Sequence, residues 1–445
     1  METKLADWIR NTPTGATADE ILRRCVHCGF CLATCPTYQI LGDELDGPRG
    51  RIYQIKQVLE GTPATRATQL HLDRCLTCRS CESTCPSGVE YGHLVDIGRA
   101  VVSEQVERPW RERALRWLLR EGLTRRWLFG TALKLGRAVS GVLPESLRAK
   151  VGVTRPAGPL PSQTHLRKVL LLNNCVQPAM APSIDAATAR VLDAVGVQVI
   201  IAPGSGCCGA IRQHLDDHDG ARNNIRRNID AWWPFVESDQ VEAIVMNASG
   251  CGAMVKDYAH LLRDDPAYAQ KAKRVVELTQ DVCEFLPRVL AAASSAAADA
   301  SAVASGRTTA DGSVAAGATS ARGPLDAYAA AIGPTLTPQR VAFHPPCTLQ
   351  HGLKIRGQVE ALLRSLGADL VPVRDAHLCC GSAGTYSILQ TELSQDLRVR
   401  KLAALQQAAP EVILSANIGC IAHLQGGTAI PVRHWIEWVD ERCRK

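Results

Sequence analysis

Eight cysteines in the first quarter of the chain have a spacing that suits metal clusters. They form two runs with the same frame, C-x2-C-x2-C-x3-C followed by proline, which begin at Cys25 and at Cys75. Three closely spaced thiolates can hold three corners of an iron–sulfur cube, and the fourth cysteine of each run ligates the other cluster. Zinc also binds Cys-x2-Cys pairs, but its four-ligand site leaves no role for the third cysteine. The double frame therefore predicts two [4Fe-4S] clusters.

This exchange of the fourth cysteine assigns a ligand set to each cluster. The ligands predicted for cluster one are Cys25, Cys28, Cys31 and Cys85, and those for cluster two are Cys75, Cys78, Cys81 and Cys35. Between the two runs, the stretch GRIYQIKQVLEG (50–61) places Ile52, Ile55 and Leu59 at helical spacing. We therefore expect an α-helical ferredoxin-type arrangement around both clusters.

Eight further cysteines occur in two blocks that share one order of features. In each block a strand-like segment precedes a single cysteine, a helix and a strand precede Cys-Cys-Gly, and a later strand precedes a fourth cysteine, with 31 residues between the first cysteine and the pair in both. At the ends of parallel strands, such residues meet in a crevice where ligands bind. Buried free thiols are the alternative. The candidates for a further cluster or for redox thiols are Cys175, Cys207, Cys208, Cys251, Cys347, Cys379, Cys380 and Cys420.

The elements that must position these residues predict an α+β multidomain protein. It would combine an N-terminal α-helical ferredoxin-like domain with two duplicated α/β cysteine-rich domains, each built on a parallel sheet. Within the first block, Ser183 or Asp185 is the expected cap of the helix in PSIDAATARVLDAVG. The predicted divisions are a two-cluster domain at 1–105, a basic helical segment and linker at 106–165, cysteine-rich domains at 166–290 and 336–445, and a disordered Ala/Ser-rich linker at 291–335.

Composition excludes several classes of protein. The 445 residues carry a net charge of +6 without a long basic run, which argues against nucleic-acid binding. The absence of a signal-like start or of a long apolar stretch, together with 18 cysteines, predicts a cytoplasmic protein with free thiols. The basic segment 106–150 contains Trp110, Trp117 and Trp127. It either packs the domains together or contacts a partner or the cytoplasmic face of the inner membrane.

With these motifs together, the chain resembles the iron–sulfur subunit of glycolate oxidase over nearly its whole length. Stretches that carry the resemblance include GPRGRIYQIKQVLEG, SGCCGA, NASGCGAMVKDY, HPPCTLQHGLK, CCGSAGTYSILQ and SANIGCIAHL. The resemblance implies an electron-transfer subunit of an oxidoreductase, a glycolate dehydrogenase. Separate flavin-containing subunits would oxidise glycolate to glyoxylate, or D-lactate to pyruvate, and this chain would pass the electrons to a non-oxygen acceptor such as quinone. It would bind no flavin and hold no catalytic residue of its own.

The cysteine-rich blocks are also similar to those of heterodisulfide reductase subunits, in which each block ends Cys-x2-Cys. Here the endings are Cys251-Gly-Ala-Met254 and Cys420-Ile-Ala-His423, so the last thiol is missing from both. His423 is either an unusual ligand or a hydrogen-bond donor beside the site. Two other functions stay open on the sequence: a thiol–disulfide reductase subunit, and the iron–sulfur subunit of a related lactate or glycerol-3-phosphate dehydrogenase.

Overall fold

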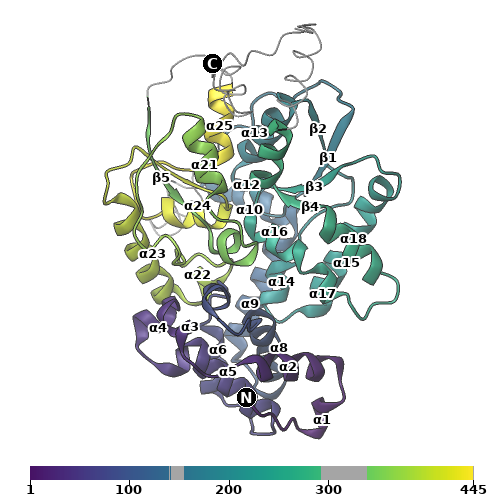
Figure 1. The fold of residues 1–445 in the computed structure, drawn as a ribbon, viewed down its shortest axis with the longest axis vertical. Helices are drawn as coiled ribbons and strands as arrows, with labels where there is room; N and C mark the ends of the chain where they lie inside the picture. Colours follow the sequence, from purple (N-terminus) through teal and green to yellow (C-terminus); the bar gives the residue numbers. More distant parts are fainter. Residues whose placement is uncertain (140, 142–154, 292–337, 444–445) are drawn as a thin grey trace, which may run out of the picture.

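The computed structural model describes residues 1–139, 141, 155–291 and 338–443. A helical part with the N-terminus forms one end of the molecule, and two α/β units lie side by side above it (Figure 1). The predicted fold class, a helical ferredoxin-like part with two α/β units, is confirmed by this arrangement. The linker predicted at 291–335 lies outside the described residues except for its first position.

The N-terminal part consists of short helices around a core of Leu22, Ile55, Leu59, Leu94 and Val95. The helix predicted at 50–61 is confirmed, because α5 covers most of that range and buries Ile52, Ile55 and Leu59. The elements are α1 (Asp7–Arg10), α2 (Pro13–Arg24), α3 (Phe30–Ala33), α4 (Pro36–Leu41), η1 (Glu44–Asp46), α5 (Pro48–Leu59), α6 (Arg66–Asp73), α7 (Ser80–Thr84) and α8 (Tyr91–Gln105).

The basic segment forms α9 (Trp110–Thr124) and α10 (Arg126–Ala138), which pack against α14 and α12 of the first α/β unit, and α9 also forms ion pairs with the helical part through Glu112 and Arg116. Arg108 and Arg116 both pair with Asp73 of the helical part and with Asp216 of the first α/β unit. The packing role expected of this segment is therefore present. Among the described residues, no helix combines the length and apolar composition needed to cross a bilayer.

The first α/β unit has a four-stranded parallel sheet in the order β2-β1-β3-β4. Its helix α13 begins at Pro182 with Ala181 as the N-cap, so the predicted cap was wrong. Ser183 donates instead to Glu437, and Asp185 accepts from Gln177. The elements are β1 (Arg167–Leu171), α12 (Gln177–Met180), α13 (Pro182–Asp193), β2 (Val197–Ile200), α14 (Ala210–His214), α15 (His218–Glu237), β3 (Ala243–Met246), α16 (Ser249–Lys256), α17 (Tyr258–Leu261), α18 (Ala269–Leu278) and β4 (Thr279–Asp281).

The second α/β unit repeats this topology, with a parallel sheet in the order β6-β5-β7-β8. The same strand order in both units confirms the predicted duplication. The two units share one hydrophobic core, in which helices α13 and α25 pack together. The elements are β5 (Arg340–His344), η3 (Thr348–Gly352), α21 (Gln358–Ser365), β6 (Asp369–Leu370), α22 (Tyr386–Leu389), α23 (Thr391–Gln406), β7 (Val412–Ser415), α24 (Ile418–Gln425), β8 (Val432–His434) and α25 (Trp435–Cys443).

Candidate metal and redox centres

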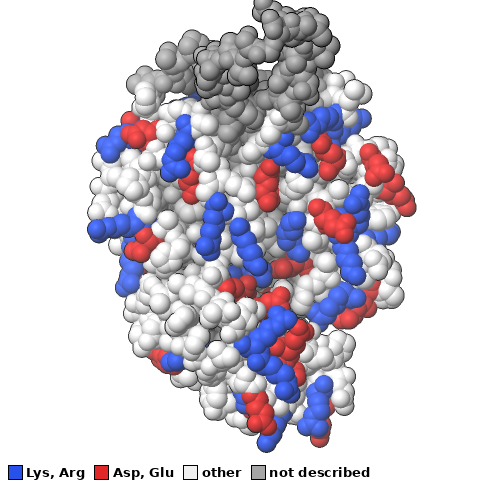
Figure 2. All heavy atoms as spheres, viewed as in Figure 1, with Lys and Arg blue, Asp and Glu red and all other residues white. Residues whose placement is uncertain are grey.

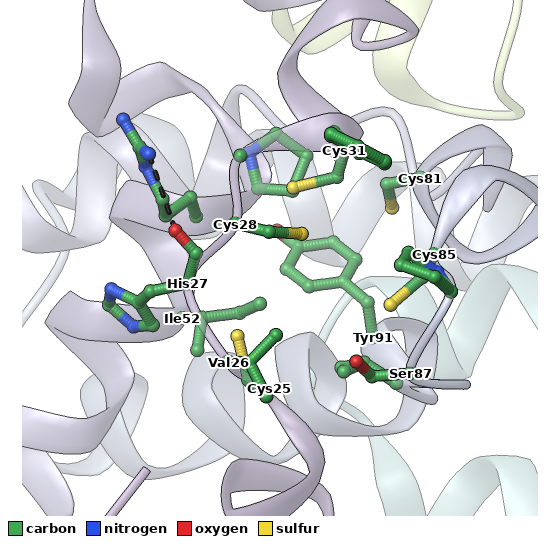
Figure 3. Close-up of a pocket in the computed structure, with 16 residues that line it drawn as sticks. Cys25, Val26, His27, Cys28, Cys31, Ile52, Cys81, Cys85, Ser87 and Tyr91 are labelled. Carbon is green, nitrogen blue, oxygen red and sulfur yellow. Dashed lines mark hydrogen bonds between the residues drawn. The ribbon is translucent and has the colours of Figure 1, made fainter.

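The first cavity in the helical part is lined by the four thiols predicted for cluster one. Cys25, Cys28 and Cys31 come from the first run, and Cys85 reaches the same cavity from the second (Figure 3). Burial and, to a lesser extent, charge repulsion from Cys25, Cys28 and Cys85 together raise the pKa of Cys31 to about 11. Four thiolates brought together repel one another, and a bound metal cation removes this repulsion. The residues present therefore fit an iron–sulfur cluster.

A second cavity beside the first is lined by Cys35, Cys75, Cys78 and Cys81, the four thiols predicted for cluster two. Burial raises the pKa of Cys78 and of Cys81 well above its usual value, and the neighbouring thiols add to the effect. Pro48, Cys81 and Tyr91 line both cavities, so a single layer of side chains separates them. Two redox groups held in these cavities would be direct neighbours.

The backbone of both runs is shaped to direct amide groups at the thiols. His27 and Thr77 hold equivalent places, as do Gly29 and Arg79, and all four have φ between 51° and 85°. In this left-handed region successive amides form a concave surface that binds anions. The Thr77 amide donates to Cys75 Sγ at 3.4 Å, and the His27 amide lowers the pKa of Cys25, although burial raises it more. Such amide donors stabilise thiolate ligands.

Two buried arginines distinguish the second cavity from the first. Arg51 is 1% exposed and pairs with Asp46, while Arg99 is 8% exposed and donates to the carbonyl oxygen of Cys75 at 2.6 Å. Burial opposes the charge of both guanidinium groups, but the negative charge of Cys75 acts to raise the pKa of Arg51 and of Arg99. Positive charge beside a cluster favours its reduced form. The second cavity is therefore the more favourable one for an electron.

The first cysteine-rich site lies where the strands of the first sheet end. Cys175 follows β1, Cys207 and Cys208 follow β2, and Cys251 lies in α16 after β3. Hydrogen bonds connect neighbouring thiols and raise the pKa of Cys175 and Cys208 well above its usual value. Cys207 accepts from both Cys175 and Cys208, which lowers its pKa. The four predicted residues thus form one thiol group, in which all but Cys251 are buried.

The second cysteine-rich site has the same construction. Cys347 follows β5 with its Sγ 3.8 Å from that of Cys379, and Cys380 interacts with both Cys379 and Cys420. In each block the glycine after the cysteine pair donates its amide to a cysteine sulfur, over 3.5 Å from Gly209 to Cys207 and 3.4 Å from Gly381 to Cys379. All sixteen candidate cysteines therefore gather in four groups of four.

The second cavity faces the second cysteine-rich site directly. Leu76, Cys347, Cys379, Tyr386 and Leu397 form one apolar cluster, and Cys78 packs against it. The Tyr386 hydroxyl donates to the Arg74 carbonyl oxygen at 3.1 Å, which ties the two parts together. Burial raises the pKa of Cys78, and the charge of Cys347 raises it further; the charge of Cys78 in turn acts to raise the pKa of Cys379. The two sites therefore influence each other electrostatically.

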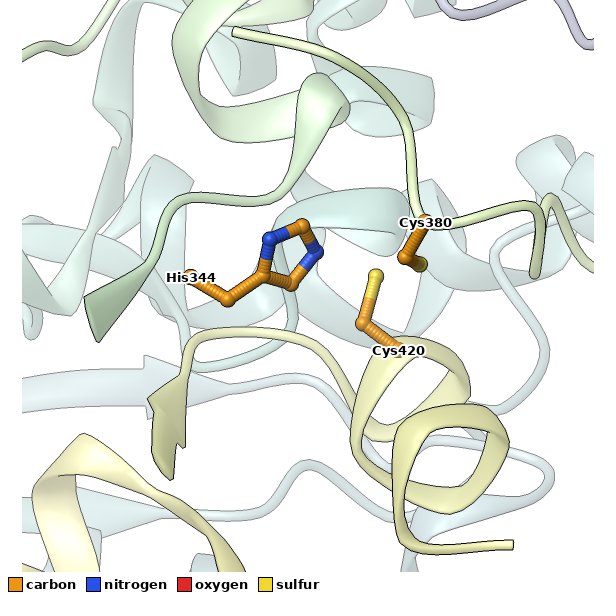
Figure 4. A group of neighbouring side chains, drawn as sticks. All are labelled: His344, Cys380 and Cys420. Atoms are coloured by element: carbon orange, nitrogen blue, oxygen red, sulfur yellow. The ribbon is translucent and has the colours of Figure 1, made fainter. Parts of the chain in front are cut away.

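Sequence reasoning missed three buried residues of these sites. Arg51 and Arg99 are isolated in the sequence, and no local pattern marks them. His344 lies beside Cys380 and Cys420 (Figure 4). The sequence does contain a sign of this residue: three positions before the first cysteine, the second block has His344 where the first block has Leu172, so the duplicated blocks differ there. His423, the histidine considered from the sequence, has its Nε2 3.3 Å from both Oγ and the carbonyl oxygen of Ser394, which agrees with the hydrogen-bonding interpretation.

The fold and the grouped thiols define a class, the iron–sulfur electron-transfer proteins, and comparison with known proteins supports this. Residues 21–89 match the 4Fe-4S dicluster domain, and residues 169–256 and 341–425 match the cysteine-rich domain.

Whole-chain comparison specifies the family. The glycolate oxidase iron-sulfur subunit of Escherichia coli is 47% identical, with both chains covered completely. A probable glycolate oxidase iron-sulfur subunit of Bacillus subtilis is 29% identical over 91% of this chain and 89% of its own. The lactate utilization protein A of Bacillus licheniformis is 24% identical over 62% of this chain and all of its own. The chain belongs to the glycolate oxidase iron-sulfur subunit family.

Proposed function

We propose that the chain is the electron-transfer subunit of a glycolate dehydrogenase complex. Cluster one would bind to the thiols of the first cavity and cluster two to those of the second, and once bound they supply one-electron transfer. The observation that carries this proposal is that each cavity joins cysteines of both runs. The first cavity holds all four thiols predicted for cluster one, together with Cys81, which it shares with the second cavity, and the second holds the four thiols predicted for cluster two. The predicted ligand residues and domain boundaries are part of this proposal.

Flavin-containing subunits are the proposed electron donors. Cys28 is exposed, and Val26 and Phe30 beside it are 67% and 62% exposed. An apolar surface at the rim of a redox site suits a protein partner, because docking excludes water and shortens the distance for electron transfer. The second cavity instead packs against the second cysteine-rich site. Electrons would therefore enter on the Cys28 side and leave on the Cys347 side.

We place the acceptor, a quinone, beyond the cysteine-rich sites, which would hold a further cluster or redox thiols. Trp110, Trp117 and Trp127 on α9 and α10 are between 58% and 69% exposed, and they would give peripheral contact with the cytoplasmic face of the inner membrane. Positive and negative side chains are interspersed on the face in Figure 2, so the net charge forms no single basic patch there. Contact through tryptophans would then resist salt more than contact through charge.

Serine substitutions of the two crossing cysteines test the ligand sets. In anaerobically prepared protein, about eight irons correspond to two cubane clusters, and additional iron indicates loaded cysteine-rich sites. Cys85→Ser should remove the EPR signal that Cys25→Ser removes, and Cys35→Ser the signal that Cys75→Ser removes. Cys283→Ala is the matched control, since Cys283 is a buried cysteine outside both sequence frames, and besides burial the charged neighbours that shift its pKa are Asp281 and Glu284, not thiols of the four groups. If Cys85→Ser removes the same signal as Cys75→Ser, the crossing assignment is wrong.

Activity of the complex tests the function itself. Each cluster variant should abolish glycolate-dependent dye reduction while the flavin subunits stay folded and associated. Glycolate and D-lactate are compared in the same assay, because a lactate utilization protein is among the similar chains. A purified chain that reduces disulfides alone and captures no flavoprotein would favour the thiol–disulfide reductase instead.

A further inference from the structure

The second cysteine-rich site contains a histidine where the first has a leucine. His344 is the last residue of β5, three positions before Cys347, and Leu172 lies three positions before Cys175. Both side chains are 1% exposed, so the duplicated fold buries this position in both units. An imidazole is costly to bury where a leucine suffices, unless it binds something.

The ring of His344 is directed at two cysteines of this site. One ring nitrogen and the Sγ atoms of Cys380 and Cys420 all lie within 4.8 Å of one another (Figure 4). His344 ends β5, Cys380 lies in the loop that follows β6, and Cys420 lies in the first turn of α24 after β7, so the parallel sheet brings all three to one edge. Two thiolates bound to one metal ion lie about 3.8 Å apart, given metal–sulfur bonds near 2.3 Å. The group is therefore compact enough for a shared metal centre.

Neither nitrogen of His344 has a hydrogen-bond partner in the described part of the chain. A buried polar group left in this state costs about 1–3 kcal/mol, and native proteins rarely retain one without a ligand. A ring nitrogen without a hydrogen-bond partner is free to bind a metal through its lone pair. The Ser415 hydroxyl donates to the His344 carbonyl oxygen at 2.9 Å and holds the backbone in place.

We propose that His344 is a metal ligand, and that the second cysteine-rich site binds a thiophilic metal through His344, Cys380 and Cys420, with Cys347 and Cys379 alongside. The metal is iron, as part of a cluster, or zinc. The first site, with Leu172, offers thiolates only. This inference rests on the proposed role of the cysteines as a metal site and adds a donor that differs between the duplicated units.

An imidazole ligand has an electrical consequence. It is neutral, so His344 adds a donor without adding the negative charge of a thiolate, and histidine ligation raises the potential of iron–sulfur centres. Lys401 adds to this effect, because it is buried, donates to the Asp375 carbonyl oxygen at 2.7 Å and feels the charges of Cys380 and Cys379. If iron is bound, the second site is therefore the more oxidising of the two, and it is the one in contact with Cys78.

Isotope labelling tests the ligand without relying on a variant. The full-length chain is produced anaerobically with ¹⁵N-histidine, its iron and zinc contents are measured, and metal–nitrogen coupling is recorded by pulsed EPR for iron or by zinc-edge X-ray absorption. We expect a histidine nitrogen bound to the metal. A wild-type protein that holds metal in this site without any nitrogen signal overturns the proposal.

Three variants separate this inference from the proposed function. His344→Leu should lose the nitrogen signal and retain less metal against a chelator, by at least tenfold, while His423→Leu, the matched control in the same unit, should keep both. Cys380→Ser should lose the metal. If Cys380→Ser loses the metal while His344→Leu keeps both the nitrogen signal and the metal, His344 is not a ligand, and the proposed cysteine site is unaffected. If neither variant changes metal content, the cysteine site itself fails.

Discussion

Replacement of Arg99 by methionine should lower the reduction potential of the cluster in the second cavity. Arg99 donates to Leu72, Cys75 and Thr77, which offer only neutral oxygens, at distances of 2.6 to 3.2 Å. No carboxylate in the described part of the chain hydrogen-bonds to it, so its charge acts on the nearby thiolates. Methionine keeps much of the buried volume and removes that charge.

The expected size of the shift follows from the separation of the charges. The guanidinium group contacts the Cys75 carbonyl oxygen at 2.6 Å, and a cluster bound through the side chain of the same residue would lie several ångströms farther away. We take a separation on the order of 8 Å for the charge interaction. At an effective dielectric constant of about 20, two unit charges at this distance interact by about 2 kcal/mol. For a one-electron centre, this corresponds to a potential about 90 mV lower.

The assay is a redox titration of the anaerobic protein, followed by EPR. Arg99→Lys retains the charge and is the matched control, with an expected shift of less than ~30 mV. The first cavity is farther from Arg99, so its cluster should change less than the second. Equal shifts in both variants, or no shift in Arg99→Met with both EPR signals intact, would refute the electrostatic argument.

Two further predictions concern the interfaces and the turns. Asp257 joins the first cysteine-rich unit to Arg79 at 3.3 Å and to His93 at 3.4 Å, and His93 stacks on His260. Burial opposes ionisation of Asp257, but His93 and Arg79 hold its pKa below 3.8, so its contribution is present above that pH and is lost as pH falls through the lowered pKa. Burial acts against protonation of His93, but Asp257 raises its pKa above 6.5, so that contribution is lost as pH rises through the raised value. Asp257→Asn should therefore lower the melting temperature most near pH 5 to 6 and less near pH 3 and pH 9, and a pH-independent difference would contradict this. Gly381→Ala should destabilise the protein by more than 2 kcal/mol in chemical denaturation, because its φ is +88° and a Cβ would lie 2.5 Å from the Ser394 carbonyl oxygen. The control Gly357→Ala, with φ +76° and open space, should cost only about 1 kcal/mol, and equal costs would show that the close contact is irrelevant.

The sequence alone determined the features that depend on local spacing. Ligand frames such as the run from Cys25 are recognisable because cluster geometry requires closely spaced thiolates. Helix α5 was predictable because Ile52, Ile55 and Leu59 face one side at helical spacing. The duplicated parallel sheet followed from repeated strand and helix patterns, and the structure has both copies in the same strand order.

Only the tertiary structure decided which groups meet across the chain. Ser183 or Asp185 was expected to cap a helix, yet Ser183 donates to Glu437, 254 residues away, because packing against α25 competes with local capping. The approach of Cys78 to Cys347, and of His344 to Cys380 and Cys420, likewise depends on how whole units pack. Residue spacing encodes which thiols can share a metal, whereas the neighbours of each site, which set its charge and potential, come from contacts that no local pattern specifies.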